Sequence, residues 1–382
     1  MKKAETSNTK TAVRDGRFEL LRILAMLLIL LQHPLERSME NGLPDVMNAP
    51  LSTNWIFASA VSIWGQLGVM LFVMISSWFM SDRQGIKGKK ILMLFLQVWT
   101  TCLLMIAAAA VICPERLRVG LLIKEAVTPV FRRHYWFISA FLAFFISVPL
   151  LQKLVHALSD RALRNTCIVM TLLIPLYNCL DENVGGAWAD FCYIFMVTAY
   201  LKRTPDNWFR RNCWQFLIGM AGITVCLIGC KMLFSGSGLL EHLLSALRGR
   251  TLPMFLVTIE LLYCFEQMKP ICSKAVNLIG STMFGVYLIH ENYLFRGEEN
   301  GNALVWNEWL HVDQLFLHDR LYIVKYLLIV VLVFAGCILM ELLRQHLIER
   351  WYRSSRLLEQ LESKIDQFYS NRSDEVTCDK TK

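Results

Sequence analysis

Two ionisable side chains, Arg22 and His33, lie inside the first apolar segment of the chain, FELLRILAMLLILLQHP. Ionisable groups within a bilayer-length apolar segment are costly, and those that are retained usually line a pathway or a reaction site. The two residues are eleven positions apart. At about 100° per residue, a helix would place both side chains on one face, about 16 Å apart along its axis. We therefore expect one helix face to carry a fixed cation at one depth and a titratable imidazole near the far end.

The elements that position these residues are apolar segments of membrane-spanning length, which takes about 20 helical residues. Of the 382 residues, 55% are hydrophobic and 18% are charged, and the mean hydropathy is +0.42. Because this composition lies far outside the range of soluble domains, we predict an all-α, polytopic membrane protein with about ten transmembrane helices. The expected spans are 18–36, 55–81, 91–112, 135–156, 163–180, 186–201, 214–233, 251–267, 275–296 and 321–345.

The chain ends flank one membrane domain, predicted to cover residues 18–345. The tail 1–17 is basic and precedes an apolar segment, as in a signal peptide, but no small-residue cleavage site follows it. We interpret the segment as a retained first helix. The polar C-terminal tail, 346–382, contains LLEQLESKIDQF, whose spacing predicts a short amphipathic surface helix. Its apolar face would carry Leu357, Leu358, Leu361, Ile365 and Phe368.

The Lys and Arg residues predict the orientation of the helices. Most of the 39 basic residues fall in segments on the same side as the N-terminus, which places both termini in the cytoplasm of a multi-pass inner-membrane protein. The net charge of +8 therefore orients helices in a lipid bilayer, and no nucleic-acid partner is expected. The basic segment 113–134 is the exception on the predicted outside. It either dips back toward the membrane, serves an anionic ligand, or is a solvated loop.

The twelve Cys residues show no CxxC or Cys/His ligand spacing. Several lie within apolar segments, where cysteine behaves as a small buried hydrophobic residue. We therefore predict no metal site and no disulfide framework. Other residues do converge on the outer end of the expected spans: the histidines His33, His134 and His290 come to one level there. Two carboxylates accompany them, Glu36 three residues after His33 and Glu291 beside His290.

Four motifs in chain order resemble the acyltransferase-3 family of integral membrane acyltransferases, which includes O-acetyltransferases of bacterial surface polysaccharides. Arg22 and His33 match the family's Arg-x10-His arrangement in its first helix. GVMLFVMISSWFM is similar to the family's second-helix segment, with Ser76 at the serine position and a serine in place of the usual glycine.

The fourth and ninth expected helices extend the resemblance. HYWFISAFLAFFISVPLL is similar to the family's H-x-W-F-L…P-L-L pattern, with His134 and Trp136 at the matching positions. STMFGVYLIHENYL resembles F-G-I-Y-L-I-H, matched by Tyr287 and His290. Each motif alone is weak, but four in order across 18–345 of a ten-helix chain are specific.

The resemblance implies transfer of an acyl group, most simply acetyl, from cytoplasmic acyl-coenzyme A to a hydroxyl of an extracytoplasmic glycan or lipid-linked sugar. Acetyl-CoA would be a co-substrate, and no permanently bound cofactor is expected. Arg22 would hold polar parts of the donor, since guanidinium stays charged when desolvated. His33 would be the general base, because imidazole titrates near neutral pH. His290 would donate to the oxyanion or orient the sugar, and Glu36 would orient the His33 ring.

The remaining predicted site residues have less specific roles. His134, Trp136 and Tyr287 are expected on the acceptor side, and Ser76 beside the donor, where it is an acyl carrier or, more simply, a structural serine in a helix interface. Glu260, an acid within an expected span, either lines the pore or pairs with a buried cation.

Two other functions were weighed. A transporter exporting a small metabolite would use the charged stripe as its binding site, but no internal repeat or broken helix in corresponding halves is present. A non-catalytic assembly subunit would be expected to lack the Arg or the His, and both are here. The sequence makes no prediction of the oligomeric state.

Overall fold

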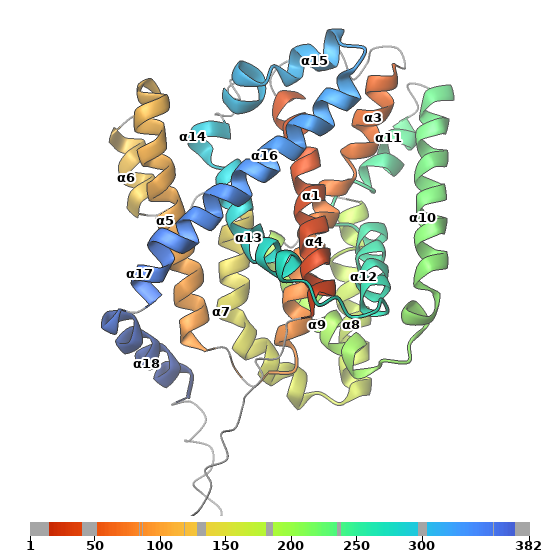
Figure 1. Cartoon of the computed structure of the whole chain (residues 1–382). Helices are drawn as coiled ribbons and strands as arrows, with labels where there is room; N and C mark the ends of the chain where they lie inside the picture. Colours follow the sequence, from red (N-terminus) through yellow and green to blue (C-terminus); the bar gives the residue numbers. More distant parts are fainter. Residues whose placement is uncertain are drawn as a thin grey trace, which may run out of the picture.

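The computed structural model describes residues 15–39, 52–83, 85, 87–117, 119–127, 135–180, 186–234, 238–296, 304–353 and 355–370. Every regular element in these ranges is a helix (Figure 1). The first half of the chain forms α1 (Gly16–Met39), α3 (Thr53–Val61), α4 (Trp64–Met80), α5 (Gly88–Ile112), η1 (Pro114–Arg116), α6 (Val119–Val127), α7 (Trp136–Ala157), α8 (Asp160–Leu173), η4 (Tyr177–Cys179) and α9 (Gly186–Arg203). The second half forms α10 (Trp208–Leu233), α11 (Gly238–Ser245), α12 (Leu252–Glu266), α13 (Lys274–His290), α14 (Tyr293–Arg296), η5 (Leu304–Trp309), α15 (Val312–His318), α16 (Tyr322–Arg344), η6 (Gln345–Glu349), α17 (Arg350–Arg353) and α18 (Arg356–Ser370).

Six helical segments in the described part of the chain are long and apolar enough to cross a membrane by themselves. They are Gly16–Ser38, Thr53–Met80, Gly88–Ile112, Trp136–Ala157, Trp208–Cys230 and Tyr322–Arg353. The other four expected spans coincide with the shorter or more polar helices α8, α9, α12 and α13. The predicted all-α, polytopic membrane fold is confirmed.

Helix α1 lies at the centre of the bundle, whereas α5 and α10 lie at its two edges (Figure 1). The central side chains Leu21, Ala25 and Leu30 of α1 are fully buried. The peripheral helices instead expose large apolar side chains, such as Ile218 on α10 and Leu332 on α16. This distribution fits a bundle whose outer surface faces hydrocarbon, where exposed apolar side chains carry no penalty.

Helices α1 and α4 approach each other closely because α4 has glycines at the crossing. A Cβ atom on Gly68 would overlap the backbone oxygen of Ala25, and one on Gly65 would overlap the side chain of Gln32. Small residues at such positions let two membrane helices pack backbone to backbone. The contact fixes the depth of α1 relative to α4 and so the depth of the neighbouring His33.

Helix α13 crosses between α1 and α16, and again glycines set the contacts. The side chain of Glu19 on α1 occupies the space that a Cβ on Gly280 would need. On another face of α13, the side chain of Glu341 on α16 occupies the space beside Gly285. Two carboxylates therefore lie directly against the α13 backbone.

The C-terminal tail contains the expected helix, α18, which packs against the start of α5. The backbone N–H of Gly88 donates to the Asp366 carboxylate at 2.6 Å, and Lys89 lies 3.6 Å from Glu362. Leu357 and Leu361 stay exposed, while the Phe368 side chain lies outside the described residues. In the basic segment 113–134, α6 forms, and the side chains of its Lys and Arg residues also lie outside the described part.

Candidate active site

His33 lies near the C-terminal end of α1, directly before a proline inside the helix. Pro34 has no backbone N–H, so the helix loses one of its hydrogen bonds there. The hydroxyl of Tyr326 on α16 donates to the backbone oxygen of Leu31 one turn earlier. A neighbouring helix therefore supports the backbone that carries His33.

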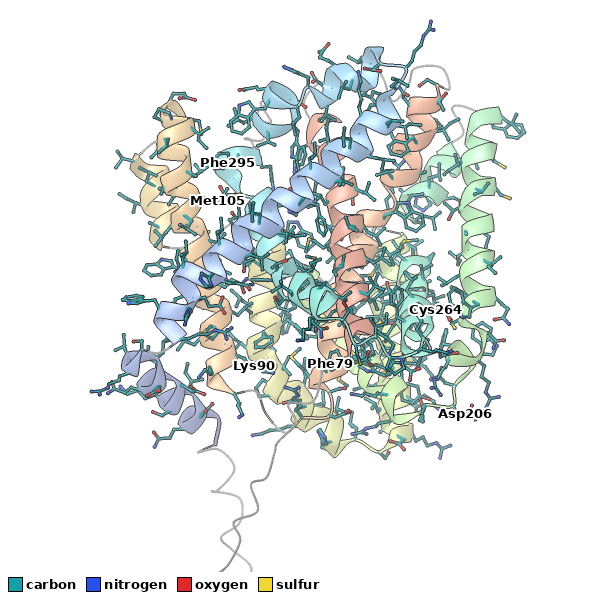
Figure 2. The ribbon with its side chains drawn as sticks, in the orientation of Figure 1. Phe79, Lys90, Met105, Asp206, Cys264 and Phe295 are labelled. Carbon is teal, nitrogen blue, oxygen red and sulfur yellow. The ribbon has the colours of Figure 1, made fainter. Side chains whose placement is uncertain are left out.

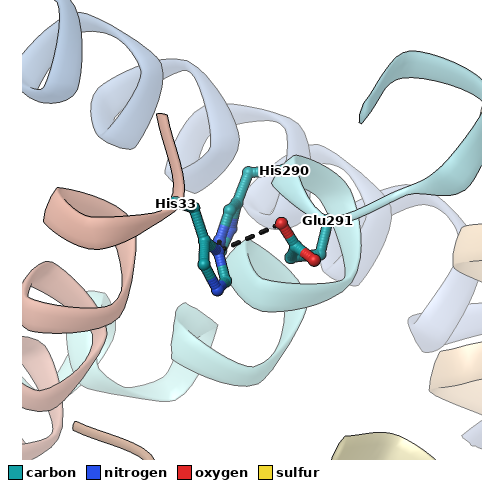
Figure 3. A group of neighbouring side chains, drawn as sticks. All are labelled: His33, His290 and Glu291. Atoms are coloured by element: carbon teal, nitrogen blue, oxygen red, sulfur yellow. Dashed lines mark hydrogen bonds and ion pairs between the residues drawn. The ribbon is translucent and has the colours of Figure 1, made fainter. Parts of the chain in front are cut away.

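The structure brings His33 together with His290 and Glu291, which end α13 and begin the turn after it (Figure 3). Nδ1 of His33 lies 2.9 Å from Nε2 of His290 and 3.1 Å from an oxygen of Glu291. His290 is 7% exposed and Glu291 1% exposed. Residues 257 positions apart in the chain thus form one buried cluster.

The hydrogen bonds fix where the protons of the two neutral rings lie. Nδ1 of His290 is 2.6 Å from the carbonyl oxygen of Val286, and a carbonyl can only accept, so this nitrogen carries the proton. Nε2 of His290 must then accept from His33. Nδ1 of His33 is therefore protonated, and its lone pair is on Nε2, which no described residue contacts by a hydrogen bond. Both nitrogens of His290 are engaged, so the neutral ring has no donor left for an oxyanion.

Glu291 is held by two arginines as well as by His33. Its second oxygen accepts from Arg37 at 3.0 Å and from Arg296 at 2.7 Å. With both imidazoles neutral, two guanidinium groups and one carboxylate give this cluster a net charge of +1. An environment of this sign favours a negative charge that develops close by.

The same three residues could present ligand atoms to a metal ion, since these atoms lie within 4.8 Å of one another. Two guanidinium groups on Glu291 would repel a divalent cation there, and Nδ1 of His290 is already committed to Val286. The expectation of no metal site stays a prediction, which this local charge supports.

The carboxylate at the His33 ring is that of Glu291, whereas the sequence analysis assigned the orienting role to Glu36. Glu36 has a 38% exposed side chain and lies 3.9 Å from Arg37. Three residues after His33, its side chain points about 60° around the helix from the imidazole. Glu291 reaches the ring because α13 ends beside it.

Arg22 lies in the N-terminal half of α1 and forms an ion pair one turn earlier, with Glu19 at 2.6 Å. Its guanidinium carbon lies 5.8 Å from the ring centre of Phe79 on α4. Glu260, considered as a partner for a buried cation, is fully buried on α12, and neither of its oxygens accepts a hydrogen bond from a described residue. Ser76 donates to the carbonyl of Phe72 at 2.9 Å, as serines within membrane helices commonly do.

The residues predicted for the acceptor side divide into three cases. Tyr287 is buried beside the histidines, with its ring centre 6.4 Å from that of His33 and 5.8 Å from that of His290. Trp136 begins α7, and the guanidinium carbon of Arg250 lies 5.2 Å from its ring centre. Arg250 is in turn paired with Asp190. His134 lies outside the described residues.

Sequence reasoning missed Arg37 and Arg296 and left Glu291 without a role. For Arg37 a signal existed, because it follows His33 by four residues and so lies on the same helix face. The approach of Glu291 and Arg296 depends on how α13 packs against α1, which no local spacing reveals.

Comparison with known proteins gives one match. A model of the acyltransferase-3 family, described as an acyltransferase domain, matches residues 15–342. The matched range runs from the start of α1 into the last turn of α16 and contains Arg22, His33 and His290. No curated protein and no solved structure gives a match.

Proposed function

The chain belongs to the acyltransferase-3 family and is a membrane acyltransferase; on that premise we propose that it moves an acyl group from acyl-coenzyme A to a hydroxyl of an extracytoplasmic glycan. The observation that carries this proposal is the His33–His290–Glu291 cluster, in which Nε2 of His33 keeps its lone pair. When a hydroxyl attacks a thioester, a base removes the hydroxyl proton and positive charge stabilises the oxyanion. His33 and the neighbouring pair of arginines could supply these two functions.

In the proposed reaction, Nε2 of His33 takes the proton of the acceptor hydroxyl while the hydroxyl oxygen attacks the thioester carbon. The carbon–oxygen bond forms, and the carbonyl oxygen becomes an oxyanion. When the oxyanion collapses, the carbon–sulfur bond breaks, and the leaving thiolate receives the proton from His33. The products are the acyl ester and free coenzyme A, and the imidazole returns to its neutral form.

The neighbours of His33 have distinct roles in this scheme. Glu291, 3.1 Å from Nδ1, stabilises the imidazolium that forms during the reaction. His290 is a positioning residue, because its committed tautomer holds the His33 ring. Arg37 and Arg296 supply the positive field for the oxyanion, a role that the sequence analysis gave to His290.

The donor would enter from the cytoplasmic side of an inner membrane, where acyl-coenzyme A is made. Arg22, in the inner half of α1, is proposed to bind polar atoms of the donor. Its ion pair with Glu19 holds the guanidinium in one orientation. The side chain is 15% exposed. Ser76, bonded to its own helix, is proposed as a structural serine.

Proteoliposomes containing the purified full-length protein test the proposal. Labelled acetyl-coenzyme A is supplied on one side and a surface-glycan extract on the other, and ester-linked label is measured on the glycan by mass spectrometry. Wild type should transfer label and His33→Gln should not. Movement of an intact labelled metabolite without ester formation would favour the transporter instead.

A further inference from the structure

A groove of about 830 Å³ lies at the end of the bundle that the charge pattern places in the cytoplasm, between α5, α13 and the η6–α17 segment. Lys89, Lys90 and Arg353 line it, and Glu349 is the acidic residue in its lining. The lining therefore carries a net charge of +2. Lys90 lies on the lower part of α5, on the side of the bundle where α17 and α18 lie (Figure 2).

This groove is separate from the histidine cluster. Ser281 lines it from α13, and His290 follows Ser281 by nine positions on the same helix. Nine residues correspond to about 900° of helix rotation, which places the two side chains on opposite faces. The groove is thus on the α5 and α16 side of α13, away from α1.

The surroundings of the groove are those of a lipid-facing surface. Phe95 on α5 and Leu343 on α16 are exposed apolar side chains on the helices that border it. Trp351, on α17, is 80% exposed. Exposed tryptophan is enriched at the level of lipid headgroups, with apolar side chains at the depth of the acyl chains.

Two of the basic side chains, Lys89 and Arg353, keep exposed surface for a ligand. Lys89 lies 3.6 Å from Glu362 on α18, yet 54% of its side chain is exposed. Arg353 donates to Glu349 at 2.9 Å, yet 63% of its side chain is exposed. Each cation therefore shares its charge with one carboxylate and still faces the opening of the groove.

We propose that this groove binds the phosphate headgroup of an anionic phospholipid of the inner leaflet. Basic pockets between membrane helices on the cytoplasmic side suit such headgroups. The +2 lining would contact the phosphate, while the exposed apolar faces of α5 and α16 would contact the acyl chains. A second phosphate-bearing ligand, the nucleotide end of the acyl donor, would have to reach the histidines from the far side of α13, so the lipid is favoured.

The test measures lipid retained by the purified full-length protein. The protein is reconstituted in nanodiscs of phosphatidylcholine and phosphatidylglycerol with matched chains, extracted, and examined by native mass spectrometry. Wild type should retain phosphatidylglycerol in preference to phosphatidylcholine. Each basic side chain near a charged membrane contributes a similar binding energy. Lys90→Gln should therefore weaken this retention about fivefold, and the double variant with Lys90→Gln and Arg353→Gln should weaken it about 25-fold. Lys90→Arg and the exposed Lys364→Gln should behave as wild type.

Two results of the lipid measurement would overturn the proposal. One is equal retention of phosphatidylglycerol by wild type and the double variant. The other is displacement of the bound lipid by adenosine 3′,5′-bisphosphate at concentrations where inorganic phosphate has no effect, which would identify a nucleotide site. Lys90 and Arg353 are both exposed, so their substitution should not unfold the protein, and size-exclusion chromatography checks this. A reporter fused after residue 85 should be cytoplasmic, and an outside signal would also overturn the proposal.

Discussion

Two of the buried clusters of charged side chains in the described part of the bundle differ in how completely their polar groups are used. At the end predicted to be the inner one, Arg344 donates twice to Glu341, at 2.8 Å each, and once to Glu349 at 2.6 Å. A fourth hydrogen bond goes to the hydroxyl of Tyr352 at 3.2 Å. Glu341 also accepts from Gln97 and Gln345 at 2.9 Å.

At the end predicted to be the outer one, the cluster of His33, His290 and Glu291 is less deeply buried, with 13% of the His33 side chain exposed, and its hydrogen bonding is not complete. Its carboxylate is held by two arginines, and His290 is bonded at both ring nitrogens. Nε2 of His33 keeps a lone pair without a described partner, and Oε1 of Glu291 accepts no hydrogen bond from a described residue. A complete network fixes the positions of helices, and a network with one uncommitted base can carry out a proton transfer.

The largest expected effect separates chemistry from structure at His33. A general base typically contributes about 10²–10⁴-fold to a rate, so His33→Ala should lose that much activity while reaching the membrane at normal levels. His33→Gln, which keeps hydrogen bonding without basicity, should lose nearly as much. Initial rates per unit of folded protein give the measurement, with the exposed His156→Gln as control. Near-normal turnover by His33→Gln would remove the general-base role.

At the inner cluster, substitution should instead reduce stability. Arg344→Met would leave Glu341 buried without its cation and Glu349 with Arg353 alone, and breaking a buried ion pair in this way costs about 3–5 kcal/mol. Thermal unfolding followed by size-exclusion chromatography should show the loss. Activity per folded molecule should be retained.

The exposed neighbour Arg350 provides the control for Arg344. Arg350→Met should change the free energy of unfolding by less than about 0.5 kcal/mol, as surface substitutions usually do. If folded Arg344→Met protein were inactive, the inner cluster would have to take part in the reaction, and the contrast between the two ends would fail.

The dependence of the rate on pH is a further test of the difference between the His33 cluster and the Arg344 cluster. Protonation of Nε2 removes the lone pair of His33, so kcat/KM should fall as the pH falls, by about tenfold per pH unit below the titration of the base. Circular dichroism over the same interval should show an unchanged helical fold, because Arg344 stays charged throughout. A kcat/KM that rises as the pH falls would contradict proton transfer by a neutral imidazole.

The smallest expected effect distinguishes the two carboxylates near His33. Glu36→Gln should change the rate by no more than about twofold, since its exposed side chain places it among surface substitutions. Glu291→Gln should lower the rate much more, because it removes the charge that stabilises the His33 imidazolium and leaves two guanidinium groups without their anion. Initial rates of both variants at one pH suffice, and equal losses would return the orienting role to Glu36.

Sequence reasoning located most of the fold because membrane helices are apolar over a known length. It also expected His33 and His290 at one level, and the structure brings the two rings together. The depths of Arg22 and His33 in a membrane stay predictions. Glu36 was favoured over Glu291 because it is close in sequence, whereas the orientation of α13 decides which carboxylate touches the ring.

The inner cluster was not predicted at all. Arg344 ends a span and resembles the other basic residues that orient helices, and Glu341 lies among apolar residues of the same span. Arg344 pairs with Glu341 three residues earlier, a local spacing that could have been read from the sequence. Helices η6 and α17 continue α16, and the π-helical turn η6 brings Glu349 and Tyr352, five and eight residues after Arg344, within reach of its guanidinium. Periodicity does not reveal such a π-helical turn.

The glycines of α13 have a mechanical consequence. If α13 slid along its axis by one turn, about 5.4 Å, Glu19 would meet Val276 or Phe284 in place of Gly280. In the same way, Glu341 would meet Ser281 or Ile289 in place of Gly285. The structure has room at these two places only for a glycine. Thicker or thinner bilayers change the tilt of membrane helices at modest cost. The helices at the edge of the bundle, such as α10, are free to absorb that change, whereas α13 is locked in register with α1. The separation of the two imidazoles is therefore set by the protein and should be insensitive to the thickness of the membrane around it.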